Sequence, residues 1–142
     1  MPKLAANLTL MFNEVDFLDR FAAAAKAGFK AVEFLFPYDY DKNVLKQKLE
    51  ENKLTLALHN MPPGNWNNGE RGIGCHSDRV AEFQAGVDKA IEYANALGCT
   101  QLNCLAGIKP AHRDPLDARE TFVKNLQYAA PRLKTAGIKL LI

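Results

Sequence analysis

Short apolar runs alternate along the chain with longer segments in which apolar residues recur every three or four positions. The short runs predict strands, because apolar stretches bounded by turn residues are typical of them. The longer segments predict helices with one buried side. Strands are expected near residues 4–8, 31–36, 54–60, 100–105 and 138–142, and a helix follows each of the first four. Such alternation favours a parallel sheet in an α/β fold.

The expected helix ends resemble one another. Gly28, Gly98 and Gly137 each precede an apolar residue where a helical pattern gives way to a strand. Glycine at that point adopts the left-handed conformation that ends many helices. At the fourth junction of this kind we expect Asn52 to take the same conformation, since asparagine tolerates it better than most residues.

The helix starts carry capping signals. Asp41 precedes the second expected helix, and Asp114 with Pro115 precedes the fourth. For the first helix we expect Asn13 and Asp16 to form a capping pair, and Ser77 to open the third. Pro131 lies late in the fourth helical pattern and is expected to kink that helix or end it early.

The faces of the strands separate two parallel-sheet architectures. The third strand alternates less cleanly than the others, and one consistent assignment by period two puts the larger apolar residues on one face and points Asn7, Glu33, His59 and Asn103 the other way. A doubly wound sheet covers both faces with helices, whereas the inner face of a barrel can turn polar at its mouth. The pattern therefore favours a (βα) barrel of TIM type. Since a complete barrel takes roughly 250 residues, we expect residues 1–142 to form a single domain, the N-terminal half of a barrel with four βα units and a fifth strand.

Composition and charge limit the classes of partner that the chain is expected to bind. Eighteen basic and sixteen acidic residues leave a net charge of +2, and the basic residues are scattered, which argues against nucleic acid or an anionic membrane. No secretion signal or membrane-spanning run is expected. Three cysteines without C-x-x-C spacing predict free thiols in a reducing compartment, which we take to be the cytoplasm.

Several motifs carry a resemblance to a known family. The segments Ala5-Ala6-Asn7-Leu8, Val32-Glu33-Phe34-Leu35-Phe36-Pro37-Tyr38, Leu58-His59-Asn60 and Gly69-Glu70-Arg71-Gly72-Ile73 resemble the hydroxypyruvate isomerase family, within the larger group of xylose-isomerase-like TIM barrels. The resemblance runs through the whole chain. It implies an isomerase that interconverts hydroxypyruvate and tartronate semialdehyde, or acts on a related 2-oxo acid such as a 2-oxo-tetronate.

The resemblance also implies where the missing chemistry lies. The two catalytic glutamates of the family, and the metal ligands of the wider group, belong to the fifth to eighth strands, so we expect them after Ile142. We therefore assign no catalytic residue and no metal ligand to this chain. A divalent metal remains open for the complete protein.

The residues present suggest contacts to a small hydroxy-keto acid. Glu33 suits a substrate hydroxyl and His59 a substrate oxygen, because ligand sites in barrels collect at the carboxyl ends of strands. Each has a structural alternative, a paired strand carboxylate for Glu33 and a histidine satisfied by backbone for His59. The candidate substrate-binding residues are Asn7, Glu33, His59, Glu70, Arg71 and Asn103.

The long segment between His59 and Ser77 is expected to be functional, because it far exceeds the ~4 to 6 residues of a usual connection. Trp66 would cover the mouth of the barrel, and Arg71 would bind the substrate carboxylate through its guanidinium fork. The structural alternative is that Glu70 and Arg71 pair within the loop and Trp66 packs on the rim.

Two other functions stay open. The first is a non-catalytic half-barrel that needs a partner chain or a second copy, because both edge strands would be unpaired. The second, weaker one is a metal-dependent nuclease of the same superfold, which the near-neutral charge disfavours.

Overall fold

The computed structural model describes residues 2–142, and within them the expected alternation of strands and helices is confirmed. The elements are β1 (Ala5–Asn7), α1 (Arg20–Lys26), β2 (Ala31–Phe34), α2 (Lys42–Glu51), β3 (Thr55–Asn60), α3 (Val80–Leu97), β4 (Gln101–Asn103), α4 (Pro115–Thr135) and β5 (Lys139–Leu141). Single 3₁₀ turns cover Phe17–Asp19, Trp66–Asn68 and Ser77–Arg79.

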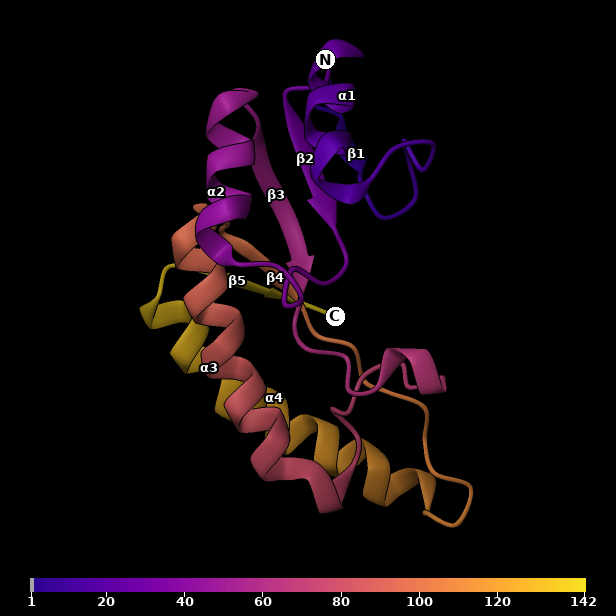
Figure 1. Ribbon diagram of the computed structural model, residues 1–142. Coiled ribbons are helices and arrows are strands. Elements are labelled where there is room, and N and C mark those ends of the chain that lie inside the picture. The colour runs from indigo at the N-terminus through magenta and orange to yellow at the C-terminus, as the bar shows by residue number, and fades with distance from the viewer. Residues whose placement is uncertain (1) are drawn as a thin grey trace.

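The strands form one open parallel sheet in the order β1-β2-β3-β4-β5. Each strand pairs with the next one along the chain, and the helices pack against one another in the same order, α1 on α2, α2 on α3 and α3 on α4. Right-handed crossovers between adjacent parallel strands place successive helices on the same side of a sheet. Figure 1 shows α2, α3 and α4 together on one side, which is the arrangement of a barrel rather than of a doubly wound sheet.

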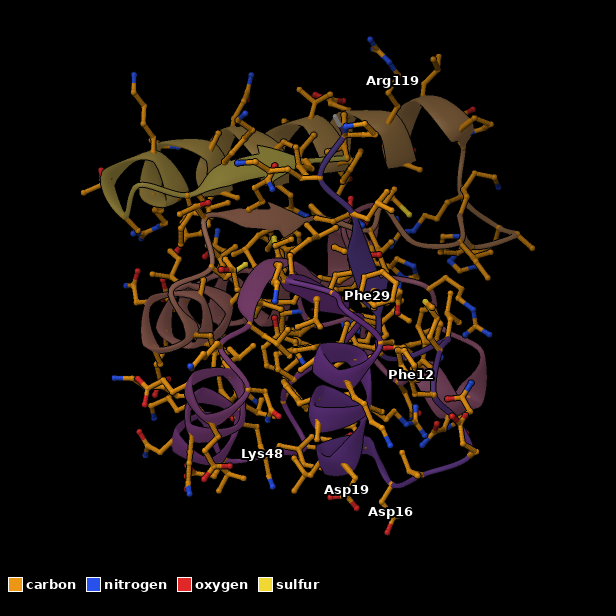
Figure 2. The ribbon with its side chains drawn as sticks, turned by 90° about the horizontal axis from the view of Figure 1, so that it is seen from above. Phe12, Asp16, Asp19, Phe29, Lys48 and Arg119 are labelled. Carbon is orange, nitrogen blue, oxygen red and sulfur yellow. The ribbon has the colours of Figure 1, made fainter. Side chains whose placement is uncertain are left out.

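The hydrophobic core lies between this helical layer and the sheet. Phe21 of α1, Leu45 of α2 and Val87 of α3 are fully buried and belong to one cluster with Val32 and Leu102 of the sheet. Burial of each such side chain stabilises the fold by roughly 1.5–3 kcal/mol. Charged side chains such as Asp16, Asp19 and Arg119 point outward (Figure 2).

The capping predictions for α2 and α4 are confirmed. Asp41 accepts hydrogen bonds from the backbone N–H groups of Asn43 and Val44, and Asp114 accepts one from Leu116. The capping pair expected at the first helix is wrong: the Asn13 side chain donates to the carbonyl of Leu10, and Asp16 makes no capping hydrogen bond. Here the loop before the helix uses the carboxamide to satisfy its own carbonyl.

The third helical segment starts at Ser77, as expected, but as a 3₁₀ turn that leads into α3 and without a capping side chain. Helix α4 does not end early at Pro131, because it continues to Thr135. Leu133, just beyond the proline, is fully buried, and tertiary packing of this kind outweighs the local cost of proline.

The glycine predictions at the helix ends are confirmed, with one correction at the fourth junction. Gly28, Gly98 and Gly137 all have positive φ angles. At the end of α2 the left-handed residue is Lys53, with φ of 53°, and not Asn52, whose φ is −96°. The Asn52 side chain instead donates to the carbonyl of Lys48 in the last helical turn.

No helix within residues 2–142 is both long enough and apolar enough to cross a membrane.

Candidate functional site

Polar side chains gather on the sheet face that points away from the helices. Across a parallel sheet, residues in register share a face, and Asn7 pairs with Glu33, Glu33 with Leu58, and Asn60 with Asn103. We call the face that these residues share the inner face. It consists of Asn7, Glu33, Leu58, Asn60 and Asn103, together with Gln101, which lies two residues before Asn103 on β4. The opposite row holds Phe34, His59 and Leu102, of which Phe34 and Leu102 belong to the core beneath the helices.

Two hydrogen-bonded pairs mark the carboxyl ends of the strands on the inner face. The Asn7 carboxamide donates from Nδ2 to Glu33 Oε1 at 2.9 Å. The Asn103 carboxamide donates from Nδ2 to Asn60 Oδ1 at 3.0 Å. Both pairs join neighbouring strands, so each side chain is held by its partner before any ligand arrives. The structure thus places Asn7 and Glu33 in contact and sets Asn103 on the same face, where it contacts Asn60.

His59 lies on the other face, and the expectation that it shares a face with Asn7 and Glu33 is wrong. The register between β2 and β3 shifts after Val32, because Val32 pairs with Leu56 whereas Glu33 pairs with Leu58. Ala57 is the extra residue, and one extra residue sends every later side chain of a strand to the opposite face. Asn60 therefore occupies the inner face in place of His59.

The imidazole of His59 is fully buried among backbone and aromatic groups. Its Nδ1 lies 3.1 Å from the carbonyl oxygen of Asn60 and 3.4 Å from the hydroxyl of Tyr38. The Tyr38 hydroxyl donates to the same carbonyl at 2.6 Å. Burial lowers the pKa of His59 to about 4, so the ring is neutral at neutral pH. Burial also raises the pKa of Tyr38 above its ordinary value.

The loop from Met61 to His76 lies beyond the carboxyl ends of β3 and β4. The N–H of Met61 donates to the Asn103 carbonyl, and Gly72 forms an isolated β-bridge with Ala106. A side chain on Gly72 would collide with the backbone of Leu105, so this close approach requires glycine. The loop is therefore fastened to the sheet edge at both of these points.

Glu70 is engaged within this loop. Its carboxylate accepts hydrogen bonds from the backbone N–H of Asn65 and, at 2.5 Å, from Arg79 Nη1. The Asn65 N–H and then the Arg79 guanidinium hold the pKa of Glu70 below its ordinary value. Arg79 also forms a two-pronged pair with Glu82 of α3, at 2.7 Å for each prong. Arg79 thus ties the loop to the start of α3.

Arg71 and Trp66 form a stack on the same loop. The Arg71 guanidinium lies over the indole ring, 4.0 Å from its centroid, and its Nη1 donates to the carbonyls of Trp66 and Glu70. Trp66 also packs against Phe36, which follows β2, at a centroid distance of 4.9 Å. These contacts match the structural alternative for the loop, and the exposed Arg71 side chain still borders solvent.

Sequence reasoning gave no role to Asn60 or Arg79, and it assigned Tyr38 only to packing near the end of a strand. Asn60 adjoins His59, but only the bulge at Ala57 decides which of the two faces inward, and no sequence signal marks a bulge without a glycine. Arg79 was detectable in principle as a basic residue three positions before Glu82 at a helix start. Its partner Glu70 lies nine positions earlier in an irregular loop, which no periodicity relates to it.

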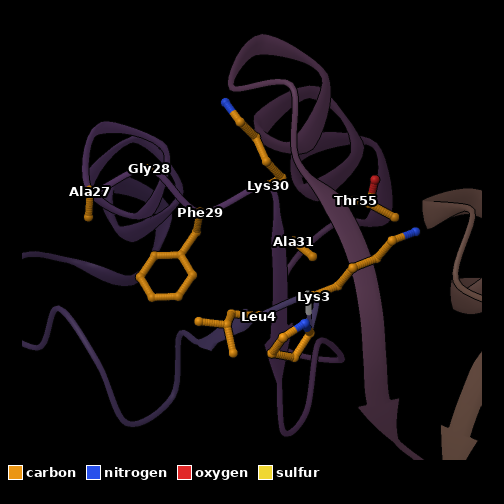
Figure 3. Close-up of a pocket in the computed structure, with 9 residues that line it drawn as sticks. Lys3, Leu4, Ala27, Gly28, Phe29, Lys30, Ala31 and Thr55 are labelled. Carbon is orange, nitrogen blue, oxygen red and sulfur yellow. The ribbon is translucent and has the colours of Figure 1, made fainter.

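Hollows and thiols elsewhere do not coincide with the inner-face residues. A cavity of about 800 Å³ lies at the amino ends of β1 and β2, lined by residues that include Leu4, Phe29, Lys30 and Thr55 (Figure 3). This is the end opposite to Asn7 and Glu33. All three cysteines are free and buried, and burial raises the pKa of the Cys104 thiol to about 12, which leaves it protonated and unreactive at neutral pH.

The described residues do not form a metal site by themselves. Residues 2–142 hold no group of three or more His, Cys, Asp or Glu side chains that could ligate an ion.

Comparison with known proteins places these features in a family context. Residues 21–142 match the family described as xylose isomerase-like TIM barrel. The chain is 51% identical over 142 residues to the hydroxypyruvate isomerase of Escherichia coli (strain K12), covering 100% of this chain and 55% of that protein. It is 49% identical to the 2-oxo-tetronate isomerase of Haemophilus influenzae, covering 99% and 54% respectively.

A solved structure described as AP endonuclease, family 2 from Brucella melitensis has the same fold over this length, with a TM-score of 0.95 and 50% identity. The match covers 99% of this chain and 54% of that one. The chain therefore spans about half the length of the curated relatives it matches.

Proposed function

Because the chain belongs to the xylose isomerase-like TIM barrel family, we propose that it serves in an isomerase that interconverts hydroxypyruvate and tartronate semialdehyde or a related 2-oxo acid. The observation that carries the proposal is the paired set of polar side chains on the inner face, at the strand ends where TIM barrels bind their substrates. Relatives named hydroxypyruvate isomerase and 2-oxo-tetronate isomerase support the substrate class.

The reaction moves a carbonyl between neighbouring carbons. A base removes a proton from the hydroxyl-bearing carbon, an enediolate forms, and a proton returns to the adjacent carbon. In our proposal no residue of this chain is that base. Glu33 accepts a hydrogen bond from a substrate hydroxyl, and the carboxamides of Asn7, Asn60 and Asn103 hold the oxygens of the enediolate. Each carboxamide nitrogen carries two N–H donors, so Asn103 has one more to give beyond its bond to Asn60.

The loop supplies the remaining proposed contacts. We place the substrate carboxylate next to Arg71, whose guanidinium is exposed at the carboxyl-end side of the sheet. Glu70 then acts as a brace that fixes the loop through Asn65 and Arg79 rather than as a direct contact. His59 acts indirectly, through Asn60.

The test is turnover of hydroxypyruvate by the purified chain, alone and within any longer polypeptide encoded with it. In an active form, Glu33→Gln should lower kcat/KM by roughly 10- to 100-fold, as expected for a hydrogen bond to a charged group worth about 1.5–3 kcal/mol. Glu120→Gln, on the exposed side of α4, is the matched control and should leave kcat/KM unchanged. No turnover of any 2-oxo acid by either form would refute the proposal.

The name of one relative favours a second function. The Brucella melitensis structure is described as an AP endonuclease, and this description supports the nuclease as an alternative function. Against it stand the net charge of +2 and an inner face of carboxamides and a carboxylate, which do not attract a phosphate backbone. Nicking of a duplex with one abasic site, under conditions where hydroxypyruvate is not converted, would establish the nuclease instead.

A third possibility is a non-catalytic half-barrel that depends on a partner. Strands β1 and β5 each pair on one side only in the described sheet, and open edges recruit further strands. Light scattering on the purified chain decides this: a stable monomer at micromolar concentration would exclude the need for a partner, whereas a dimer would support a homo-oligomer.

We also propose a cytoplasmic location and a small-molecule hydroxy-keto acid as the partner, with neither nucleic acid nor membrane involved. Three buried free cysteines support a reducing compartment. Labelling of the thiols in freshly lysed cells tests this, because oxidised cysteines would count against it.

A further inference from the structure

We propose that Tyr38 and His59 are positioning residues that hold the backbone of Asn60 from beneath the helices and thereby set its carboxamide against Asn103 on the inner face. The link to catalysis rests on the proposed function, but the positioning itself does not. The proposal gives a role to the buried imidazole of His59, which has no direct part in the proposed reaction.

Both side chains converge on a single acceptor. The carbonyl oxygen of Asn60 lies 2.6 Å from the Tyr38 hydroxyl and 3.1 Å from His59 Nδ1. A carbonyl has two lone pairs and accepts two hydrogen bonds. The Asn60 N–H is also engaged, because it donates to the carbonyl of Leu35. The peptide groups on both sides of the Asn60 Cα are thus fixed, and the carboxamide can turn only about its own side-chain bonds.

The Tyr38 ring is itself held in place. It packs edge-on against Tyr93 of α3 at a centroid distance of 5.2 Å, and Lys89 of α3 lies over it at 5.2 Å. Tyr93 in turn donates to the carbonyl of Tyr40 at 2.9 Å. A helix on one side of the sheet is therefore connected, through Tyr38 and the Asn60 peptide, to the Asn60–Asn103 pair on the other side.

The bulge makes this arrangement possible. Because Ala57 is extra, His59 and Asn60 point to opposite faces, with the imidazole under the helices and the carboxamide on the inner face. The carbonyl of Ala57 is not left unsatisfied, since Gln101 Nε2 donates to it at 3.0 Å. An inner-face side chain from β4 thus stabilises the irregular backbone that aims Asn60.

Proton positions follow from the same contacts. To donate to the Asn60 carbonyl, His59 must carry its proton on Nδ1, which leaves Nε2 as an unprotonated nitrogen. Nε2 is buried and has no hydrogen-bond partner among residues 2–142. A bare lone pair there is tolerable, whereas an N–H or a charged ring would bury an unpaired donor. The proposal therefore requires the neutral Nδ1–H tautomer.

The first test needs no variant and no activity. Nitrogen-15 spectra of the histidine rings in the wild-type chain at pH 7 should show His59 protonated at Nδ1 and bare at Nε2. Protonation at Nε2 would overturn the proposal, because Nδ1 could then not donate to Asn60.

The second test separates positioning from general packing. Tyr38→Phe removes only the hydroxyl bonded to Asn60, and Tyr93→Phe removes a hydroxyl from the same aromatic cluster that bonds elsewhere. Tyr38→Phe should shift the side-chain amide signals of Asn60 and Asn103 and speed their hydrogen exchange, while Tyr93→Phe leaves both pairs of signals in place. Unchanged signals in Tyr38→Phe, or equal changes in both variants, would refute positioning. Either result is independent of whether the protein turns over hydroxypyruvate.

Discussion

Acid should destabilise this protein through His59. In the unfolded chain the imidazole takes up a proton near its ordinary pKa of 6.5, whereas in the folded chain burial lowers that pKa to about 4. Between these values the unfolded state binds more protons, so the free energy of unfolding falls as the pH falls. At 1.36 kcal/mol per pKa unit, we expect His59 to remove about 3 kcal/mol between pH 7 and pH 4.

Tyr38 and Cys99, the titratable side chains beside His59, stay neutral throughout this window. Burial raises the pKa of the Tyr38 hydroxyl and of the Cys99 thiol, and α3 contributes Tyr93 and Lys89 to the same aromatic cluster. A change in stability between pH 7 and pH 4 that disappears when His59 is replaced therefore belongs to His59.

The assay is urea unfolding followed by far-ultraviolet circular dichroism at several pH values, for the wild type and for His59→Gln. The difference in unfolding free energy between the two should shrink by about 3 kcal/mol from pH 7 to pH 4, because the glutamine does not titrate. His112→Gln, which replaces an exposed histidine, should follow the wild-type pH dependence. If the curves of wild type and His59→Gln run parallel, the imidazole is not buried as described.

Three further predictions concern the loop from Met61 to His76. Gly72→Ala should lower the unfolding free energy by about 2 kcal/mol or more, because Gly72 combines a positive φ with a clash of the added Cβ against the backbone. Gly28→Ala is the comparison outside the loop: Gly28 has a positive φ but open space around it, so its unfolding free energy in urea titrations should fall by about 1–2 kcal/mol. Arg79→Gln should speed hydrogen exchange and proteolysis of the loop without exposing the sheet, because it removes the tie to Glu70; equal protection would contradict that role. Arg71→Ala in an active form should raise KM more than it lowers kcat, and an unchanged KM would remove Arg71 from the site.

Much of the fold follows from local chemistry. The aspartates before α2 and α4 cap their helices because a short carboxylate reaches the N–H groups two and three residues on, wherever the chain sits. Gly28, Gly98 and Gly137 end helices because glycine alone adopts the left-handed conformation without strain. The same rule wrongly assigned the left-handed conformation to Asn52. Lys53 adopts it instead, despite the steric strain, and the next residue, Leu54, is buried.

The positions of half of the candidate site residues on the sheet could also be predicted from the sequence. Asn7, Glu33 and Asn103 lie on strands whose alternation is regular, so period two assigns them to the inner face. The loop between His59 and Ser77 was recognisable by its length and its glycines. The sequence did not show which charged residues of the loop lack a partner. Glu70 pairs with Arg79, and only the folded loop brings these two residues together.

The sequence by itself determined the order of strands and helices, the helix boundaries set by caps, and the polar character of the strand ends, because each depends on neighbours within one helical turn or a few strand positions. The tertiary structure decided which of His59 and Asn60 lies on the inner face. That choice depends on the pairing of β3 with β2 across Ala57, and the preference for one register over another arises from packing across the sheet, which no stretch of the chain contains alone.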